Sequence, residues 1–108
     1  MYMKDYTLQL KLLHGLSNKT RYQILQVLRN GEVNVTELIE QVEGSQSSVS
    51  QHLACLRDCG LIQKRTEGKY YFYTITTPKI TQLMDFLNET VQDFHWDGEV
   101  IECKHHME

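Results

Sequence analysis

Apolar side chains recur every three or four residues in several segments of the chain, a spacing typical of helices that pack one face against a core. The first such segment runs over Tyr6–His14. Ser17 is expected to cap the second, which should end before Gly31. A third, short helix is expected to open with the capping sequence Asn34–Glu37 and to end at Gly44.

Ser45 can cap a fourth helix, which should run to about Asp58 with Gly60 following its end. Beyond that glycine the pattern changes to two expected strands, 61–66 and 70–75, joined by a glycine turn. Pro78 then favours the first turn of a last helix. The apolar positions of that helix keep helical spacing through Ile80, Leu83, Met84, Leu87, Val91 and Phe94.

Four helices, a β-hairpin and a long last helix give the element order of a winged helix-turn-helix, a mainly α fold with a small β-hairpin. Residues 1–95 are expected to form a DNA-binding and dimerisation domain, and 96–108 a C-terminal tail. The apolar face of the last helix is deeper than a small domain needs. With the leucines of the first helix it predicts a homodimer that binds an inverted repeat. The alternative is a monomer whose last helix covers only its own core.

The fourth helix opens with small and polar side chains, as a helix that enters the major groove does. Because serine is a poor helix former, its accumulation here favours DNA contact over a plain surface helix. The residues expected to face DNA are Gln46, Ser47, Ser48, Ser50, Gln51 and His52. The expected phosphate contacts are Arg57 near the helix end and the wing residues Lys64, Arg65 and Lys69.

The composition and motif content of the chain limit the classes of function that it can have. The net charge of −3 over 108 residues means that DNA binding must come from a local basic patch. No stretch approaches the length of a membrane span and the N-terminus lacks a signal-peptide pattern, so we expect a cytoplasmic protein. The chain shows no Ser/His/Asp set, phosphate-binding glycine loop or paired carboxylates, so we do not expect an enzyme.

The three cysteines are the candidate metal ligands of the chain. Cys55 and Cys59 lie four residues apart, which on a helix places their Cβ atoms about 5–6 Å from each other. With Cys103 from the tail they would form a soft three-thiolate site suited to Cd(II) or Pb(II). Zn(II) would prefer a fourth ligand, which His105 or His106 could supply, although solvated tail histidines are the simpler interpretation.

Two motifs give the chain a resemblance to a known family. Residues 16–25, LSNKTRYQIL, and 45–61, SQSSVSQHLACLRDCGL, look like the helix 2 signature and the recognition helix of the ArsR/SmtB family of bacterial metal-responsive repressors. The resemblance implies a homodimer that leaves its operator when an inducing metal binds. The family's Cys-x-Cys site is missing, since this chain has Asn34-Val-Thr36 there, and its Asp-x-His site is missing at Thr77–Ile80.

What remains resembles the CmtR-like cadmium/lead sensors, which use two cysteines four apart on the recognition helix and one from the tail. Cys55, Cys59 and Cys103 match that pattern. The hypothesis is a repressor induced by Cd(II) or Pb(II), with Zn(II) as a further candidate. The alternative keeps the fold and lets the cysteines respond to oxidants, persulfides or As(III).

Overall fold

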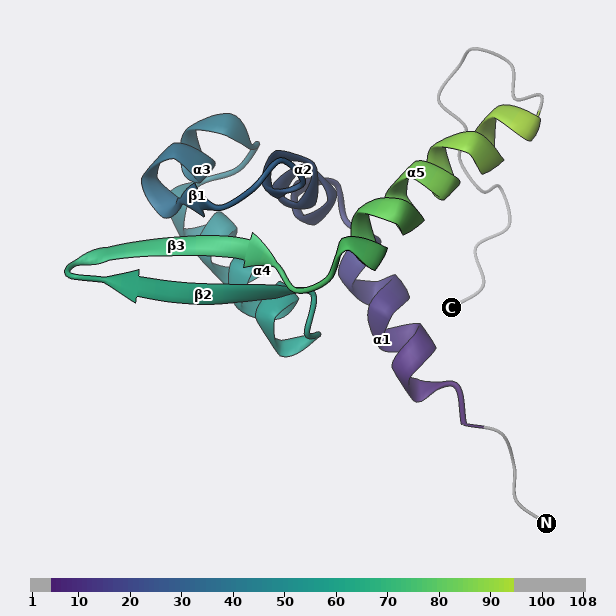
Figure 1. Cartoon of the computed structure of the whole chain (residues 1–108), viewed down its shortest axis with the longest axis horizontal. Helices are drawn as coiled ribbons and strands as arrows, with labels where there is room; N and C mark the ends of the chain where they lie inside the picture. The colour runs from purple at the N-terminus through teal and green to yellow at the C-terminus, as the bar shows by residue number, and fades with distance from the viewer. Residues whose placement is uncertain (1–4, 95–108) are drawn as a thin grey trace.

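The computed structural model describes residues 5–94 and confirms the predicted order of five helices with a hairpin between the last two (Figure 1). One further short strand precedes the third helix. The elements are α1 (Thr7–Leu16), α2 (Lys19–Leu28), β1 (Val33–Asn34), α3 (Val35–Gln41), α4 (Gln46–Asp58), β2 (Ile62–Glu67), β3 (Tyr70–Ile75) and α5 (Pro78–Asp93).

The core forms where the apolar stripes of the helices meet above the sheet. In α4 the stripe is Val49, Leu53 and Leu56, each at most 1% exposed. The spacing of i, i+4 and i+7 places these side chains on one face of the helix, so the opposite face is left to solvent. The stripe packs in a cluster with these buried residues from the rest of the chain: Leu16, Ile24, Leu25, Leu28, Leu38, Leu61, Ile62, Tyr73, Ile80 and Met84.

The wing is an antiparallel hairpin of β2 and β3, with β1 added at the other edge of β3. Strand β1 was not predicted, because two residues are too short to show an alternating pattern. Successive side chains of a strand point to opposite faces. Ile62 therefore shares a face with Lys64 and Tyr73, while Arg65 lies on the other face, directly opposite Phe72.

Side-chain caps set most helix starts as expected. The side chain of Ser45 accepts from the Ser48 N–H at 3.1 Å, and that of Thr77 accepts from the Lys79 N–H at 3.3 Å. Asn34 caps α3 by accepting from the N–H two residues later. The prediction of Ser17 as the cap of α2 was wrong, because α1 extends to Leu16 and Asn18 caps α2 instead.

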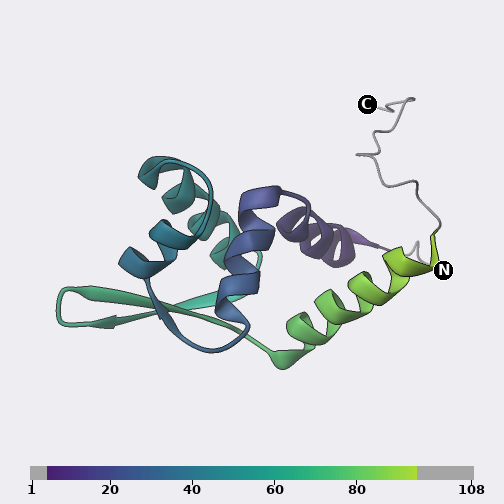
Figure 2. The ribbon, with the colours of Figure 1, turned by 90° about the horizontal axis from the view of Figure 1, so that it is seen from above.

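Helices α1 and α5 lie at the end of the molecule opposite the wing tip (Figures 1 and 2). The first half of α5 is anchored by buried Ile80 and Met84 and by an Arg29–Asp85 ion pair of 2.7 Å. Farther along, Val91 is 43% exposed. None of the helices within residues 5–94 is both long and apolar enough to span a bilayer.

Gly15 of α1 lies tightly against the segment that follows α4. A Cβ added there would lie 2.3 Å from Leu61 Cδ1 and 3.7 Å from the Cβ of Cys59. Leu61 is only 3% exposed and packs in the hydrophobic core, so its displacement would disturb buried neighbours. We expect Gly15→Ala to lower the free energy of unfolding by about 1–2 kcal/mol, because overpacking outweighs the gain in helix propensity. Urea denaturation checks this, with exposed Gln9→Ala as control; equal stabilities would contradict the close packing.

Candidate DNA interface and metal centre

The turn between α3 and α4 is fixed by contacts with α2. The side-chain oxygen of Gln23 accepts from the Glu43 N–H at 2.9 Å, and the Thr20 hydroxyl donates to the Glu43 carbonyl at 3.2 Å. Lys19 and Gln23 also bind the Glu43 carboxylate, which lowers the pKa of that group. Gly44 completes the turn with a positive φ of 121° that favours glycine. The helix-turn-helix is therefore held as one unit with α2.

The exposed face of α4 carries most of the polar residues that were predicted from the sequence to face DNA. Gln46, Ser47, Ser50 and Gln51 are exposed, as is Arg57 in the last turn. Ser48 differs, since it is half-buried and its hydroxyl donates to the Ser45 carbonyl at 3.1 Å. The structure thus leaves the first two turns of α4 open to a partner, with the Ser48 hydroxyl already engaged in the cap.

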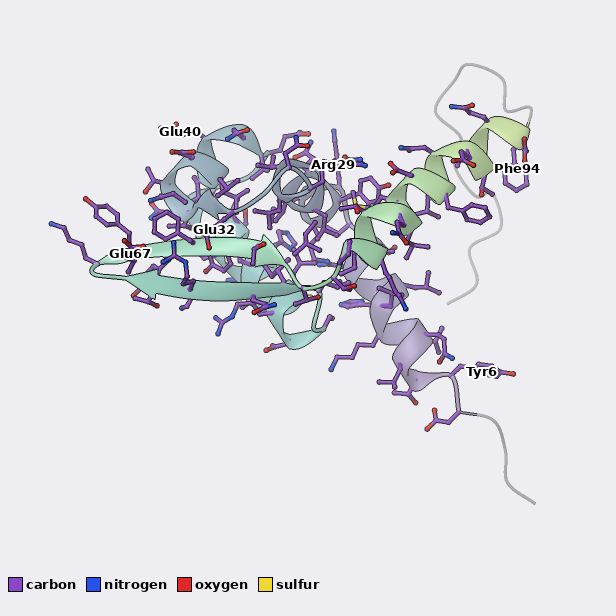
Figure 3. The ribbon with its side chains drawn as sticks, viewed as in Figure 1. Tyr6, Arg29, Glu32, Glu40, Glu67 and Phe94 are labelled. Carbon is purple, nitrogen blue, oxygen red and sulfur yellow. The ribbon has the colours of Figure 1, made fainter. Side chains whose placement is uncertain are left out.

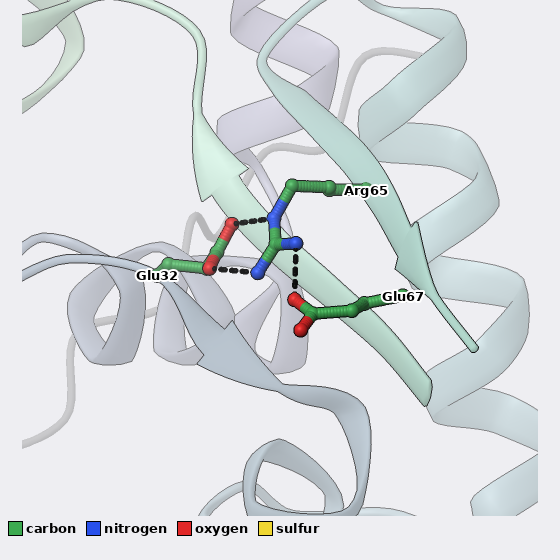
Figure 4. A network of polar contacts seen from close by, with 3 residues as sticks. All are labelled: Glu32, Arg65 and Glu67. Carbon is green, nitrogen blue, oxygen red and sulfur yellow. Dashed lines mark hydrogen bonds and ion pairs between the residues drawn. The ribbon is translucent and has the colours of Figure 1, made fainter. Parts of the chain in front are cut away.

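The cations of the wing have unequal surroundings. Lys69 lies exposed beside the hairpin turn, and the Lys64 ammonium sits 4.5 Å from the centre of the Tyr71 ring. Arg65 is engaged most strongly: its guanidinium donates to both carboxylate oxygens of Glu32 at 2.9 and 2.8 Å, and to Glu67 at 2.6 Å (Figure 4). This pairing lowers the pKa of Glu32. A DNA phosphate would have to compete with two carboxylates for Arg65.

The salt dependence of DNA binding should separate these two cations. Each phosphate contact contributes about 0.9 to the slope of log K against log salt. We expect Lys69→Gln to reduce the slope by about 0.9, and Arg65→Gln to reduce it by clearly less, because Glu32 and Glu67 already neutralise that charge. Fluorescence anisotropy at several salt concentrations measures both slopes. Equal reductions would show that the Arg65 guanidinium leaves its carboxylates to bind phosphate.

The thiols of Cys55 in α4 and of Cys59 at its C-cap are neighbours, as their spacing predicted. Cys55 and Cys59 are both half-buried and free, and the Cys59 N–H donates to the Cys55 carbonyl at 3.0 Å, so that the two residues follow one turn of backbone. Burial raises the pKa of Cys59, and the neighbouring Cys55 raises it further, while the charges of Lys11 and Arg21 act in the opposite direction. The thiol pair therefore lies where α4 meets α1 and α2, away from the exposed face of α4.

An open pocket of about 290 Å³ adjoins this thiol pair. Cys59 forms part of its wall, together with Leu12 of α1 and Leu83 of α5. The pocket joins the end of α4 to the two helices at the far end of the molecule. A ligand held by Cys59 would thus contact the recognition helix and also lie near α1 and α5.

The chemistry of the pair fits a soft metal ion, but two donors do not complete a site. Within residues 5–94 no group of three His, Cys, Asp or Glu side chains could hold a metal. Cys103 lies outside the described residues, and so do His105 and His106. The three-thiolate set therefore remains a prediction, of which the structure brings two members together.

Arg21 is a site residue that the sequence interpretation missed. It is 8% exposed and shares the buried stripe of α2 with three aliphatic residues. One of its guanidinium nitrogens lies 3.3 Å from Nδ1 of half-buried His52 on α4. An arginine at a position of the apolar stripe was the available signal, because a buried charge requires partners.

The sequence of this chain is similar to those of known transcriptional regulators. A family model described as "Bacterial regulatory protein, arsR family" matches residues 18–64. The transcriptional activator HlyU of Vibrio cholerae is 40% identical over 77 residues, which are 71% of each chain. A probable mercury resistance operon repressor of Streptomyces lividans is 35% identical over 74 residues, and the matched segment spans only 59% of its length.

Solved structures agree with the sequence matches. HlyU from Vibrio cholerae superposes with a TM-score of 0.72 at 36% identity, covering 82% of this chain and 97% of that one. A structure of reduced HlyU gives 0.69 at 37% identity, with 78% and 88% covered. The transcriptional repressor BigR from Xylella fastidiosa gives 0.71 at 33% identity, with 78% and 86% covered.

Proposed function

Because this chain belongs to the arsR family of bacterial regulatory proteins, we propose that it is a dimeric repressor that leaves operator DNA when Cd(II) or Pb(II) binds to Cys55, Cys59 and Cys103. The family and the fold identify a DNA-binding transcriptional regulator and not an enzyme. The inducer, the ligand set and the cytoplasmic location are our proposal.

The observation that carries the proposal is the position of the thiol pair. Cys55 belongs to α4, the helix that exposes Ser47, Ser50 and Gln51, and Cys59 is the residue at its C-cap. A metal that draws the two sulfurs together on one flank of α4 acts directly on the element that reads DNA. It can release DNA only if it binds the free protein more tightly than the DNA-bound protein, which on the usual scale is a coupling of about 1–3 kcal/mol.

The tail is long enough to supply the third ligand. Cys103 lies nine residues after Phe94, and nine extended residues span about 30 Å. The way back along α5 from Phe94 to Leu83, which lines the pocket beside Cys59, is only about 16 Å at the helical rise. Cys103 can therefore reach the pair along its own α5. Zn(II) would additionally need a fourth donor, such as His105 or His106.

The proposed dimer forms through α1 and α5. Tyr6, Leu10 and Leu13 of the α1 segment are each more than half exposed and recur at i, i+4 and i+7 on one face. Exposed apolar side chains gathered on one face mark an interaction surface. A two-fold axis at this end of the molecule would present two recognition helices to an inverted repeat, with half-sites about 34 Å apart.

Metal affinity should rise with pH. Since burial and Cys55 raise the pKa of Cys59, that thiol is protonated at neutral pH, and a metal must displace its proton. We expect the apparent Kd for Cd(II) to fall as the pH increases from about 6 to 8, because the thiol stays protonated over this range and a lower proton concentration favours the release of its proton. Competition with a chelator of known affinity at each pH measures it. A Kd independent of pH would show that no thiol proton leaves.

Ultraviolet absorption tests the ligand set of the proposal. Cd(II) should produce a thiolate-to-metal charge-transfer band in the wild type, with reduced intensity in Cys55→Ser, Cys59→Ser and Cys103→Ser. A band at full strength in Cys103→Ser would remove the tail from the site. A band at full strength in both Cys55→Ser and Cys59→Ser would remove this pair from the site.

A second candidate is a thiol-reactive regulator that answers oxidants, persulfides or As(III). Two adjacent reduced thiols favour it, and one solved structure of the relative HlyU is described as reduced. The raised pKa of Cys59 counts against it, because redox-sensing cysteines react as thiolates. Mass spectrometry after peroxide or polysulfide treatment decides: a Cys55–Cys103 or Cys59–Cys103 bridge that abolishes DNA binding supports this alternative.

A further inference from the structure

Arg21 connects three helices through one buried guanidinium. From α2, its Nε donates to the Gly15 carbonyl at 3.1 Å and its Nη2 donates to the His14 carbonyl at 2.7 Å, both at the end of α1. Its Nη1 lies 3.3 Å from Nδ1 of His52 on α4. Every nitrogen of the guanidinium therefore has a partner, as a buried charge requires.

The contact with Arg21 determines which ring nitrogen of His52 carries the hydrogen. A guanidinium is permanently charged and can only donate hydrogen bonds. Nδ1 of His52 must therefore accept, with its lone pair directed at Arg21. A neutral imidazole whose Nδ1 accepts carries its hydrogen on Nε2. The other tautomer would direct an N–H at a cation.

His52 lies where the hydrogen on its Nε2 could be donated to DNA. The residue lies in the second turn of α4, beside exposed Gln51 and about 60–70° around the helix from the centre of the buried stripe. The ring is half-buried, and its Nδ1 edge is the one turned to the buried guanidinium. Nε2 is separated from Nδ1 by one ring carbon, so its N–H diverges from the Nδ1 lone pair and points away from the guanidinium.

We propose that Arg21 is a positioning residue that holds His52 as the Nε2–H tautomer, so that the recognition helix presents a fixed hydrogen-bond donor to DNA. The acceptor is a purine N7, a guanine O6 or a phosphate oxygen, all of which accept such a donor. This inference rests on the proposed function, since it requires α4 to bind DNA. Arg21 itself remains buried and does not touch the nucleic acid.

The tautomer is measured without DNA. Long-range ¹H–¹⁵N correlation spectra of ¹⁵N-labelled protein at pH 7.5 to 8 should show His52 with a bare Nδ1 and a protonated Nε2, its signals being assigned by their absence from His52→Ala. Arg21→Lys should shift His52 toward a mixture of tautomers. Should that variant fail to fold, the wild-type spectrum still decides. A protonated Nδ1 or an equal mixture in the wild type overturns the proposal.

DNA binding tests whether His52 donates a hydrogen bond to DNA. The two probes are a duplex that the wild type has selected from a random pool and an unrelated duplex of equal length. A good base contact contributes about 1–3 kcal/mol, so His52→Ala should bind the selected duplex about 5- to 150-fold more weakly. His14→Ala, which removes an exposed histidine near Arg21, should bind as the wild type does.

The two sources of the acceptor give different results. A base contact predicts that His52→Ala loses affinity for the selected duplex only, whereas a phosphate contact predicts equal losses on both. Unchanged affinity for both duplexes overturns the donor role. A wild type that selects no DNA overturns the proposed function instead, and the spectrum then still decides the tautomer.

Discussion

Replacing Cys59 with serine should leave the protein on its operator at Cd(II) concentrations that release the wild type. Serine keeps the size of the side chain but replaces a soft sulfur with a hydroxyl that Cd(II) binds poorly. Removal of a neighbour that merely orients a ligand typically costs 10- to 100-fold in metal affinity. Loss of the ligand itself should therefore raise the Kd for Cd(II) by about 100-fold or more.

The readout is anisotropy of a fluorescent operator during Cd(II) titration. Cys55→Ser should behave in the same way, because the two sulfurs are neighbours at the C-terminal end of α4. Ala54→Ser is the matched control, since it places a hydroxyl on the same helix without removing a thiol. Its Cd(II) response should equal that of the wild type. Release of Cys59→Ser at wild-type Cd(II) concentrations would exclude the pair from the inducer site.

If the chain dimerises through α1 as proposed, Leu10→Glu should yield a monomer and abolish tight operator binding. Leu10 is 62% exposed and Leu13 is 55% exposed in the isolated chain, with Tyr6 at the outer end of the same segment (Figure 3). A carboxylate buried in an apolar interface without a partner is strongly destabilising. In a two-fold dimer the penalty occurs twice, because each residue appears on both sides.

Sedimentation velocity and operator anisotropy measure the two effects. We expect a folded monomer, because Leu10 lies outside the buried core, and a loss of operator affinity of about 100-fold or more, because a monomer contacts one half-site only. Gln9→Glu adds the same charge to α1 outside the stripe and should remain dimeric. A Leu10→Glu protein that stays dimeric would place the dimer interface elsewhere.

The fold was largely predictable because its determinants are local. Helical spacing and the caps Ser45 and Thr77 depend on residues within one or two turns of each other. The error at Ser17 was also local: whether α1 ended at His14 or Leu16 decided which neighbour became the cap, and helix ends are the least determined part of such a pattern. Strand β1 exists only through its pairing with β3, which the sequence does not display.

The site was predictable only in part, for the same reason. The thiol pair follows from spacing within one helix, and the structure confirms the adjacency. The surroundings of Arg65 and His52 depend on Glu32 and Arg21, which lie 33 and 31 residues away in the chain. Such partners are brought together by the folded chain alone. From the sequence, Arg65 and His52 could be identified as polar residues of the kind that usually lies at the surface. Their partners in the folded chain could not be identified.

X-ray absorption at the cadmium edge tests the central claim most directly, because it counts the sulfur atoms around the metal. The Cd(II)-loaded wild type should show three sulfur neighbours, and Cys59→Ser and Cys103→Ser should each show fewer. A wild-type spectrum dominated by nitrogen and oxygen neighbours, or three sulfurs unchanged in both variants, would contradict a site built from Cys55, Cys59 and Cys103.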